Sequence, residues 1–140
     1  MPQLKHTILL LVVALFTFSS CEKEGEEPLL TSNVVQYGKW RITQFSDNGT
    51  DKTSSFSGYE LAFSPNGIVV AAKSAATASG TWSGGDDVSK SKLILNFGTG
   101  SLFEEISEDW QVLELTSKKI RMQHVSGGSG GTALLTLERI

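Results

Sequence analysis

The clearest structural signal in this 140-residue chain is the stretch 58–73, GYELAFSPNGIVVAAK. Its first half alternates between apolar and polar residues, which gives a strand one apolar face: Tyr59, Leu61 and Phe63. In the turn Ser64-Pro65-Asn66-Gly67, proline presets the bend and glycine can adopt positive φ. Residues 68–73 suit the returning strand but are too uniformly apolar to assign a face. The stretch predicts a β-hairpin.

Similar segments, rich in β-branched and aromatic residues, lie on both sides of this hairpin and are separated by turn residues. We predict eight strands, at residues 39–46, 58–64, 68–73, 79–83, 92–97, 109–115, 118–125 and 132–139. We expect Gly84-Gly85-Asp86-Asp87 to form a loop and the run 126–131 (SGGSGG) to form a hairpin tip. One short helix is predicted after Gly100-Ser101, because three apolar residues follow at helical spacing: Leu102, Phe103 and Ile106.

Short connections between successive strands favour an up-and-down antiparallel topology. Eight such strands close into a barrel, which removes the unpaired edges of an open sheet. The sequence therefore predicts one all-β domain at residues 32–140, an eight-stranded antiparallel barrel. An immunoglobulin-like β-sandwich is the alternative, since its strand count and size also suit this chain.

The N-terminus has the parts of an export signal. Lys5 precedes an eleven-residue apolar run, 8–18, interrupted only by Thr17. As a helix this run spans only about 16 Å, too short for a bilayer core of about 30 Å. Ser19, Ser20 and the chain's one cysteine, Cys21, come next. We predict a signal peptide at residues 1–20.

This junction resembles the lipobox of bacterial lipoproteins, which implies that Cys21 is acylated and becomes the first mature residue. The sequence departs from the usual motif in having Phe18 where a leucine is typical, three positions before the cysteine. The alternative is an ordinary secretory signal with an incidental cysteine. If Cys21 is acylated, two or three chains anchor the protein durably, because each buried CH₂ contributes about 0.8 kcal/mol.

Residues 22–28 carry four acids and one base but no large hydrophobic residue, so we predict that residues 21–31 form the lipidated cysteine and an acidic, flexible tether. The tether resembles acidic stretches that direct some lipoproteins to the cell surface; a linker without an address function is the alternative. Glu22 is not the aspartate associated with inner-membrane retention. We therefore expect the protein at the outer membrane, on its periplasmic face or at the cell surface.

The charge balance argues against nucleic acid as a partner. Removing residues 1–20 leaves eleven bases and fifteen acids, and the tether accounts for most of that excess. The domain is thus nearly neutral and has no basic stripe.

A family resemblance adds to this reading. Gly38-Lys39-Trp40, at the start of the first predicted strand, looks like the G-x-W signature of the lipocalins. The resemblance implies that Trp40 closes one barrel end beneath an arginine of the last strand, here Arg139, as a cation–π pair worth about 0.5 to 2 kcal/mol. Gly80-Thr81-Trp82 and the spacing Phe103-x-x-Ile106-x-x-x-Trp110 are similar to bacterial lipocalin-like lipoproteins of the calycin type. The chain is shorter than ordinary lipocalins and lacks a cysteine pair.

No catalytic constellation is visible in the mature sequence. It has one histidine, His124, and its acids show no spacing that fixes a shared site. We expect no enzyme activity, no cofactor and no metal site. Four acids gather near the predicted helix, and we interpret them as a solvated face, with calcium binding as the alternative: Glu104, Glu105, Glu108 and Asp109.

Strand phase raises two further questions. His124 is in phase with Ile120 and Met122, which places it on the inner face near a barrel mouth, either as a structural residue or as a polar contact for a ligand. Glu114 is in phase with Trp110. A buried unpaired carboxylate is costly, so Glu114 needs a partner such as Arg121 or lies on the other face.

These features lead to two functional hypotheses. The first is a lipid-anchored envelope protein that binds a small hydrophobic ligand inside the barrel, between Tyr59, Phe63, Leu95 and Trp110, with His124 orienting it. The second is a filled barrel that acts through its outer surface on an envelope protein partner. The aromatic residues decide between them, because in a small barrel such rings either fill the interior or line a cavity.

Overall fold

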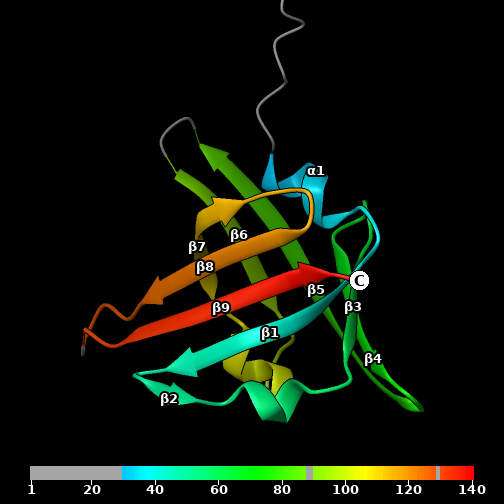
Figure 1. Ribbon diagram of the computed structural model, residues 1–140, viewed down its shortest axis with the longest axis horizontal. Helices are drawn as coiled ribbons and strands as arrows, with labels where there is room; N and C mark the ends of the chain where they lie inside the picture. The colour runs from blue at the N-terminus through cyan, green and yellow to red at the C-terminus, as the bar shows by residue number, and fades with distance from the viewer. Residues whose placement is uncertain (1–29, 88–89, 129) are drawn as a thin grey trace, which may run out of the picture.

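The computed structural model describes residues 30–87, 90–128 and 130–140 (Figure 1). The predicted signal peptide, the lipidation site Cys21 and the tether up to residue 29 lie outside the described residues. Within the described ranges, no helix combines the length and the hydropathy needed to cross a bilayer.

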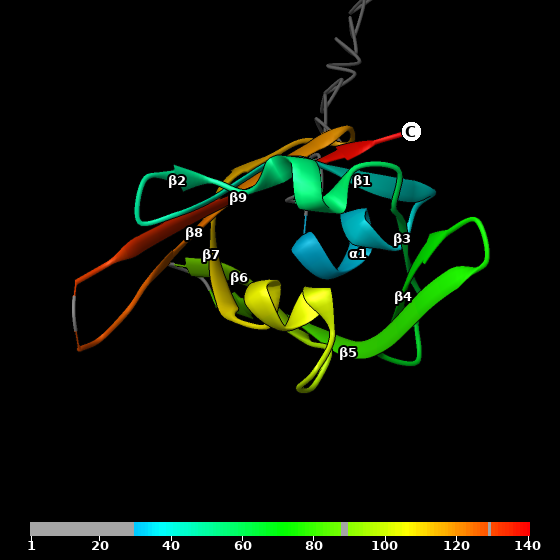
Figure 2. The same cartoon turned by 90° about the horizontal axis from the view of Figure 1, so that it is seen from below.

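In the part of the chain that the structure describes, eight antiparallel strands form one closed barrel, which confirms the predicted fold class (Figures 1 and 2). The strands are β1 (Lys39–Asp47), β3 (Glu60–Phe63), β4 (Ile68–Lys73), β5 (Ala76–Asp87), β6 (Lys90–Asn96), β7 (Asp109–Leu115), β8 (Lys119–Val125) and β9 (Thr132–Arg139). Each of them pairs with the next, and β9 pairs back to β1. The two-residue β2 (Thr50–Asp51) extends β1 as a short hairpin. The sheet is single and closed, unlike the alternative sandwich of two sheets.

The hairpin read from residues 58–73 is present as β3 and β4. Phe63 lies opposite Val69, and the Ser64 N–H donates to the Ile68 carbonyl across the turn at 2.8 Å. Gly67 has φ +82°, the conformation that this turn requires. Leu61 and Phe63 are buried, and Val69 and Ala71 form the inner face of β4.

The loop predicted at residues 84–87 is wrong, because β5 continues through them. Gly84 pairs with Leu93 of β6 instead of forming a turn. Its glycine serves a close approach: a Cβ on residue 84 would lie 2.8 Å from the Cβ of Ser32, in the helix α1 (Thr31–Val35) that rests on β5. Glycine within a strand can mark such a contact as well as a turn.

Short helical segments cover both barrel ends, with α1 at one end and two 3₁₀ turns at the other (Figures 1 and 2). These turns are η1 (Thr53–Phe56) and η2 (Leu102–Ile106), and η2 is the short helix expected from the sequence. Sequence periodicity did not predict α1 or η1, since single turns are too short to show a period. Phe56 of η1 and Phe103 of η2 meet edge to face, with ring centroids 5.4 Å apart.

Bulges in two strands change which side chains face inward. In β7 the register shifts between Val112 and Glu114, so Leu113 is exposed and Glu114 lies opposite Arg121 on the outer face. Arg121 Nη1 lies 3.3 Å from Glu114 Oε2. A strict two-residue period had placed Glu114 on the inner face, and the extra residue of the bulge reverses this assignment.

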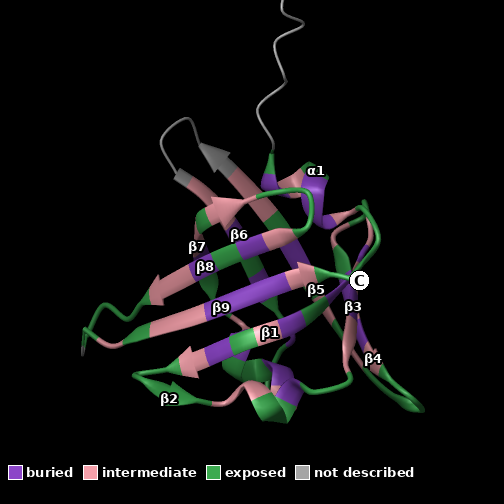
Figure 3. Cartoon of the chain, viewed as in Figure 1, coloured by how far each residue is buried: buried purple, intermediate pink, exposed green. Residues whose placement is uncertain are grey.

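The barrel interior is packed with aromatic side chains, and Figure 3 shows buried stretches on β8, β9 and α1. A chain of ring contacts with centroid separations between 4.9 and 6.4 Å links Phe97, Tyr59, Phe103, Phe56, Phe45 and Trp110. Most of these contacts are edge to face, the arrangement that the ring quadrupoles favour. This network runs from the η1 and η2 end into the middle of the barrel.

Candidate functional site

Three of the five residues predicted to hold a ligand are part of the core. Phe63, Leu95 and Trp110 are 4%, 2% and 0% exposed. Phe63 packs on Trp82, with ring centroids 5.8 Å apart, and Leu95 lies opposite Trp82 across the β5–β6 ladder. The Trp110 indole Nε1 donates to the Ile106 carbonyl at 2.9 Å. Phe63 and Leu95 thus lie beside Trp82, and Trp110 is bound to η2.

The other two, Tyr59 and His124, lie at the periphery. The Tyr59 ring packs against Phe103, with ring centroids 5.0 Å apart, and Lys73 Nζ lies 5.6 Å from the centre of the Tyr59 ring. Tyr59 also lines a depression of about 360 Å³ between β1 and β3. His124 lines a different depression of about 280 Å³, with Gln111 and Gln123 among its neighbours. The five residues are thus spread over the core and two separate surfaces, and their joint contact with one ligand stays a prediction.

His124 has structural partners. Its Nδ1 lies 2.9 Å from the Asp109 carbonyl, and because a carbonyl only accepts, Nδ1 carries the proton. Nε2 lies 3.4 Å from Glu108 Oε2, and the ring packs against Trp110 with centroids 6.1 Å apart.

Gly38, Trp40 and Arg139 meet at the α1 end. Trp40 and Arg139 are direct partners across β1 and β9, so their side chains share one side of the sheet. The Arg139 side chain crosses Gly38, where a Cβ would lie 2.9 Å from its Nε, and Gly38 has φ +76°. Arg139 Nη1 also donates to the Ser117 carbonyl at 3.4 Å. The cation–π contribution of this pair stays a prediction.

The four acids near η2 each have a separate partner. Glu104 accepts a hydrogen bond from the Gly100 N–H at 2.8 Å, Glu105 and Asp109 form ion pairs with Lys52 and Lys92, and Glu108 lies 3.4 Å from His124 Nε2. Lys52 also contacts Asp47 at 3.3 Å. The hydrogen bond to Asp47 is the largest cause that raises the pKa of the Lys52 ammonium group, and the bond to Glu105 is the second. Among the described residues, no three Asp, Glu, His or Cys side chains gather as metal ligands.

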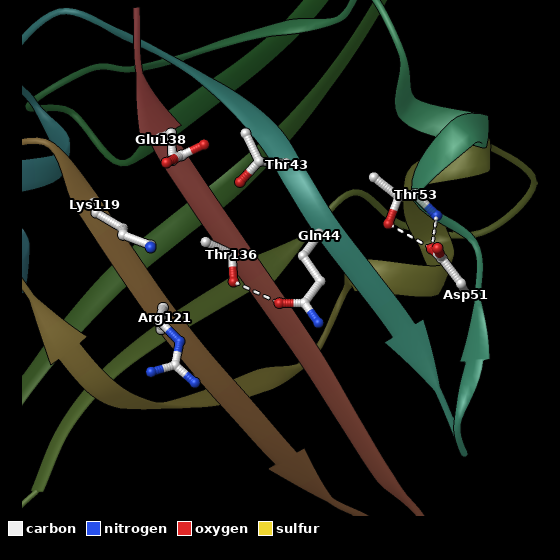
Figure 4. A pocket seen from close by; sticks show the side chains of 8 residues that line it. All are labelled: Thr43, Gln44, Asp51, Thr53, Lys119, Arg121, Thr136 and Glu138. Carbon is white, nitrogen blue, oxygen red and sulfur yellow. Dashed lines mark hydrogen bonds between the residues drawn. The ribbon is translucent and has the colours of Figure 1, made fainter.

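A polar groove of about 400 Å³ runs over the outer face of β8, β9 and β1 and is bounded by β2 and η1 (Figure 4). We call it the outer groove, and its lining residues are Thr43, Gln44, Asp51, Thr53, Lys119, Arg121, Thr136 and Glu138. In Figure 4, Lys119 and Arg121 project along one side and Asp51 and Thr53 along the opposite side, with Gln44 and Thr136 between them.

Local backbone features build this groove. A bulge in β1, between Ile42 and Gln44, places Gln44 opposite Thr136 on the outer face. Thr53 Oγ1 accepts a hydrogen bond from the Phe45 N–H at 2.9 Å, and the Lys52 N–H donates to the Phe45 carbonyl at the same distance. These bonds hold η1 beside β1, and Thr53 of η1 therefore forms part of one side of the outer groove.

Two charged residues of the outer groove, Lys119 and Glu138, lie close to each other but form no ion pair with each other. Lys119 and Glu138 are direct cross-strand neighbours, a placement in which opposite charges usually attract each other. Yet within the described part of the chain neither side chain forms an ion pair. Arg121 contacts Glu114 through one nitrogen, which leaves its other donors available.

The floor and the acidic side are preorganised. Thr136 is 5% exposed, and its Oγ1 donates to Gln44 Oε1 at 3.4 Å. Asp51 Oδ1 accepts from Thr53 Oγ1 at 2.6 Å and from the Thr53 N–H at 2.9 Å. These two bonds, the side-chain one foremost, hold the pKa of Asp51 below its ordinary value of 3.8. The carboxylate is therefore ionised and fixed in position near neutral pH.

Sequence reasoning did not identify this site. The outward phase of Lys119, Arg121, Thr136 and Glu138 could be read from their strands, and this alternation was the available signal. The contributions of Asp51, Thr53 and Gln44 could not, because they depend on η1, on β2 and on the bulge in β1.

Comparison with known proteins bears on the fold. No family model and no curated protein matches this sequence. A solved structure of a DUF4847 family protein from Bacteroides vulgatus ATCC 8482 superimposes with a TM-score of 0.54 at 13% identity, over 78% of this chain and 96% of that one. A lipocalin-like protein from Bacteroides uniformis ATCC 8492 aligns with a TM-score of 0.47 at 14% identity, over 75% and 98% of the two chains. An uncharacterized protein from Bacteroides eggerthii DSM 20697 gives 0.41 at 16% identity, over 72% and 98%. At these identities, the first likeness shows a shared fold and nothing about the ligand.

Proposed function

We propose that this protein is a lipid-anchored, non-enzymatic binding protein of the bacterial outer membrane, and that it recognises a small polar ligand at the outer groove. In this proposal the barrel interior is a packed core that holds the groove in shape. The hydrophobic ligand expected inside the barrel is replaced by a ligand on its outer face.

Packing of the interior is the observation that carries this proposal. Trp110 has no exposed surface, and its ring packs edge to face against Phe45 and His124, with ring centroids 6.4 and 6.1 Å apart. A ligand placed among Phe63, Leu95 and Trp110 would have to displace side chains that are already in contact. Protein interiors packed in this way resist insertion, which typically costs about 1 to 3 kcal/mol even for a few added methylenes.

The outer groove has the properties of a polar binding site. Its volume of about 400 Å³ falls within the common range for ligand sites, roughly 300 to 1,000 Å³. Lys119 and Glu138 lie in it without ion-pair partners among the described residues, so a ligand can contact both without first breaking a protein contact. The groove sits on the strands of a closed barrel, and such a rigid base favours binding because little order has to be gained.

Anchoring rests on the sequence around Cys21. An apolar run too short to span a bilayer, two serines and the chain's one cysteine support lipid attachment. Cys21 lies ten positions before Thr31, the first residue of α1, and a chain of that length reaches at most about 35 Å. The barrel would therefore stay close to the membrane, with its α1 end joined to the tether.

Two measurements test the proposal. In the native host, wild-type protein should incorporate labelled palmitate and fractionate with the outer membrane, whereas Cys21→Ala should do neither. The full mature chain carrying Cys21→Ala should then be titrated with palmitate, retinol and cholate while tryptophan fluorescence is followed. We expect no saturable change. A saturable change that Trp110→Phe removes would place the ligand in the interior and overturn the groove assignment.

A further inference from the structure

We propose that the outer groove binds a dipolar ligand, a short peptide of about four residues with free ends, because β9 and β1 lie between β8 and β2 and place the opposite charges about 14 Å apart. Its carboxylate lies against Lys119 and Arg121, and its ammonium group faces Asp51. This inference rests on the proposed function, because it requires the outer groove to be the binding site.

The first argument is the separation of charge. Two cations on β8 line one side of the groove, and the Asp51 carboxylate lies on the opposite side, beyond the uncharged floor of Gln44 and Thr136 (Figure 4). Glu138 lies at one end and balances the second cation. A groove that is neutral overall but divided in this way complements a ligand whose own charges are separated.

The second argument is the availability of these charges. Arg121 is held by a single 3.3 Å contact from Glu114, so most of its fork of donors can face a carboxylate. Lys119 is half-buried and has no ion-pair partner in the described part of the chain. Asp51 is oriented by two hydrogen bonds from Thr53 and keeps acceptor capacity for an ammonium group.

The third argument is what the lining lacks. None of the eight lining residues is aromatic and none is aliphatic, so the groove offers neither a ring for stacking nor an apolar wall. A hydrophobic ligand would bury four charged groups here without compensation. An uncharged sugar could exchange hydrogen bonds with these groups but carries no opposite charges to match their separation. Thr43, Gln44 and Thr136 can instead exchange hydrogen bonds with a peptide amide.

Four probes separate the contributions of the two ligand charges. They are the tetrapeptide tetra-alanine, N-acetyl-tetra-alanine without the ammonium group, tetra-alanine-amide without the carboxylate, and N-acetyl-tetra-alanine-amide with neither. Each is titrated by calorimetry and by amide chemical-shift mapping into the full mature chain carrying Cys21→Ala. We expect tetra-alanine to bind and to shift resonances of β8, β9 and η1. Removing either charge of the peptide should raise Kd about tenfold, the usual effect of losing one charge-assisted hydrogen bond.

Variants assign each charge to its partner. Arg121→Gln should remove the difference between tetra-alanine and its amide, and Asp51→Asn should remove the difference between tetra-alanine and its acetylated form. Lys118→Gln is the matched control, because Lys118 is an exposed neighbour that does not line the groove. Thermal unfolding of each variant shows that the barrel is intact.

The outcomes distinguish the two proposals. If all four probes bind equally, or if only inorganic phosphate or glucose binds in a way that depends on Arg121, the dipolar class is wrong while the groove remains the site. If amino acids, peptides, sugars and inorganic anions all leave the groove resonances unchanged, both proposals fail.

Discussion

The indole Nε1 of Trp40 donates a 2.9 Å hydrogen bond to the backbone carbonyl of Val35. Trp40 is the second residue of β1 and has no exposed surface, while Val35 ends α1, so this bond ties the barrel wall to the helix that covers one barrel end. It gives the tryptophan of the G-x-W sequence a role in this protein, which is to hold the segment that follows the tether against the barrel.

Replacing Trp40 should therefore destabilise the protein. Trp40→Phe leaves the buried Val35 carbonyl without its donor and removes ring volume, and we expect the free energy of unfolding to fall by about 2 kcal/mol or more. Urea denaturation measures this loss. Trp82→Phe is the matched control, since its Nε1 donates to the Ser64 carbonyl at the partly exposed β3–β4 turn and α1 is not involved. Only Trp40→Phe should speed amide exchange in α1; equal exchange in both variants would contradict the tie.

Two adjacent glycines in β5 should respond differently to alanine. A Cβ at residue 84 would lie 2.8 Å from the Cβ and 3.0 Å from the N of Ser32, whereas at residue 85 the nearest atom, Lys92 Cβ, is 3.6 Å away. Gly84→Ala forces α1 to move, and we expect a loss of about 1 to 3 kcal/mol. Gly85→Ala meets ordinary contact and should change stability by less than about 1 kcal/mol. Similar unfolding midpoints for the two variants would show that α1 does not rest on Gly84.

Asp51 should titrate at low pH. Because its pKa is held below 3.8 by Thr53, the stabilisation from its carboxylate is present above pH 3.8 and is lost as the pH falls through the lower folded value. A ¹³C titration of the Asp51 carboxyl should therefore show a midpoint below 3.8. Thr53→Val removes the larger cause and should raise this midpoint toward 3.8. A wild-type midpoint at or above 3.8 would rule out the hydrogen-bonded arrangement.

The bulge in β7 can be tested through Glu114. Since Glu114 and Arg121 form an exposed pair, with side chains 41% and 48% exposed, Glu114→Gln should change stability by no more than about 1 kcal/mol. An inward carboxylate would behave differently, because its neutralisation would produce a large change. Leu135→Ala, at a residue with no exposed surface, serves as the positive control and should cost about 2 to 5 kcal/mol.

Local sequence patterns were sufficient to predict the strands and the closed barrel. The alternation of Tyr59, Leu61 and Phe63, followed by Ser64-Pro65-Asn66-Gly67, identified β3 and β4, because strand period and turn chemistry are properties of neighbouring residues. Short connections throughout then made an up-and-down barrel the simplest closure. The export signal and Cys21 are likewise contiguous patterns, and what they imply about anchoring remains a prediction.

Tertiary structure decided the rest. Gly84 reads as a turn residue in sequence, but α1 approaches it from more than 50 positions away. The bulge at Thr43 turns Gln44 to the outer face, and the bulge at Leu113 places Glu114 opposite Arg121. A strict two-residue alternation in the sequence does not predict either bulge. The outer groove combines residues from β1, β2, η1, β8 and β9. Its charged side chains form one site only because strands that are distant in sequence lie side by side in the barrel. Sequence determines local conformation through near neighbours, whereas a binding surface depends on distances that exist only after the barrel has closed.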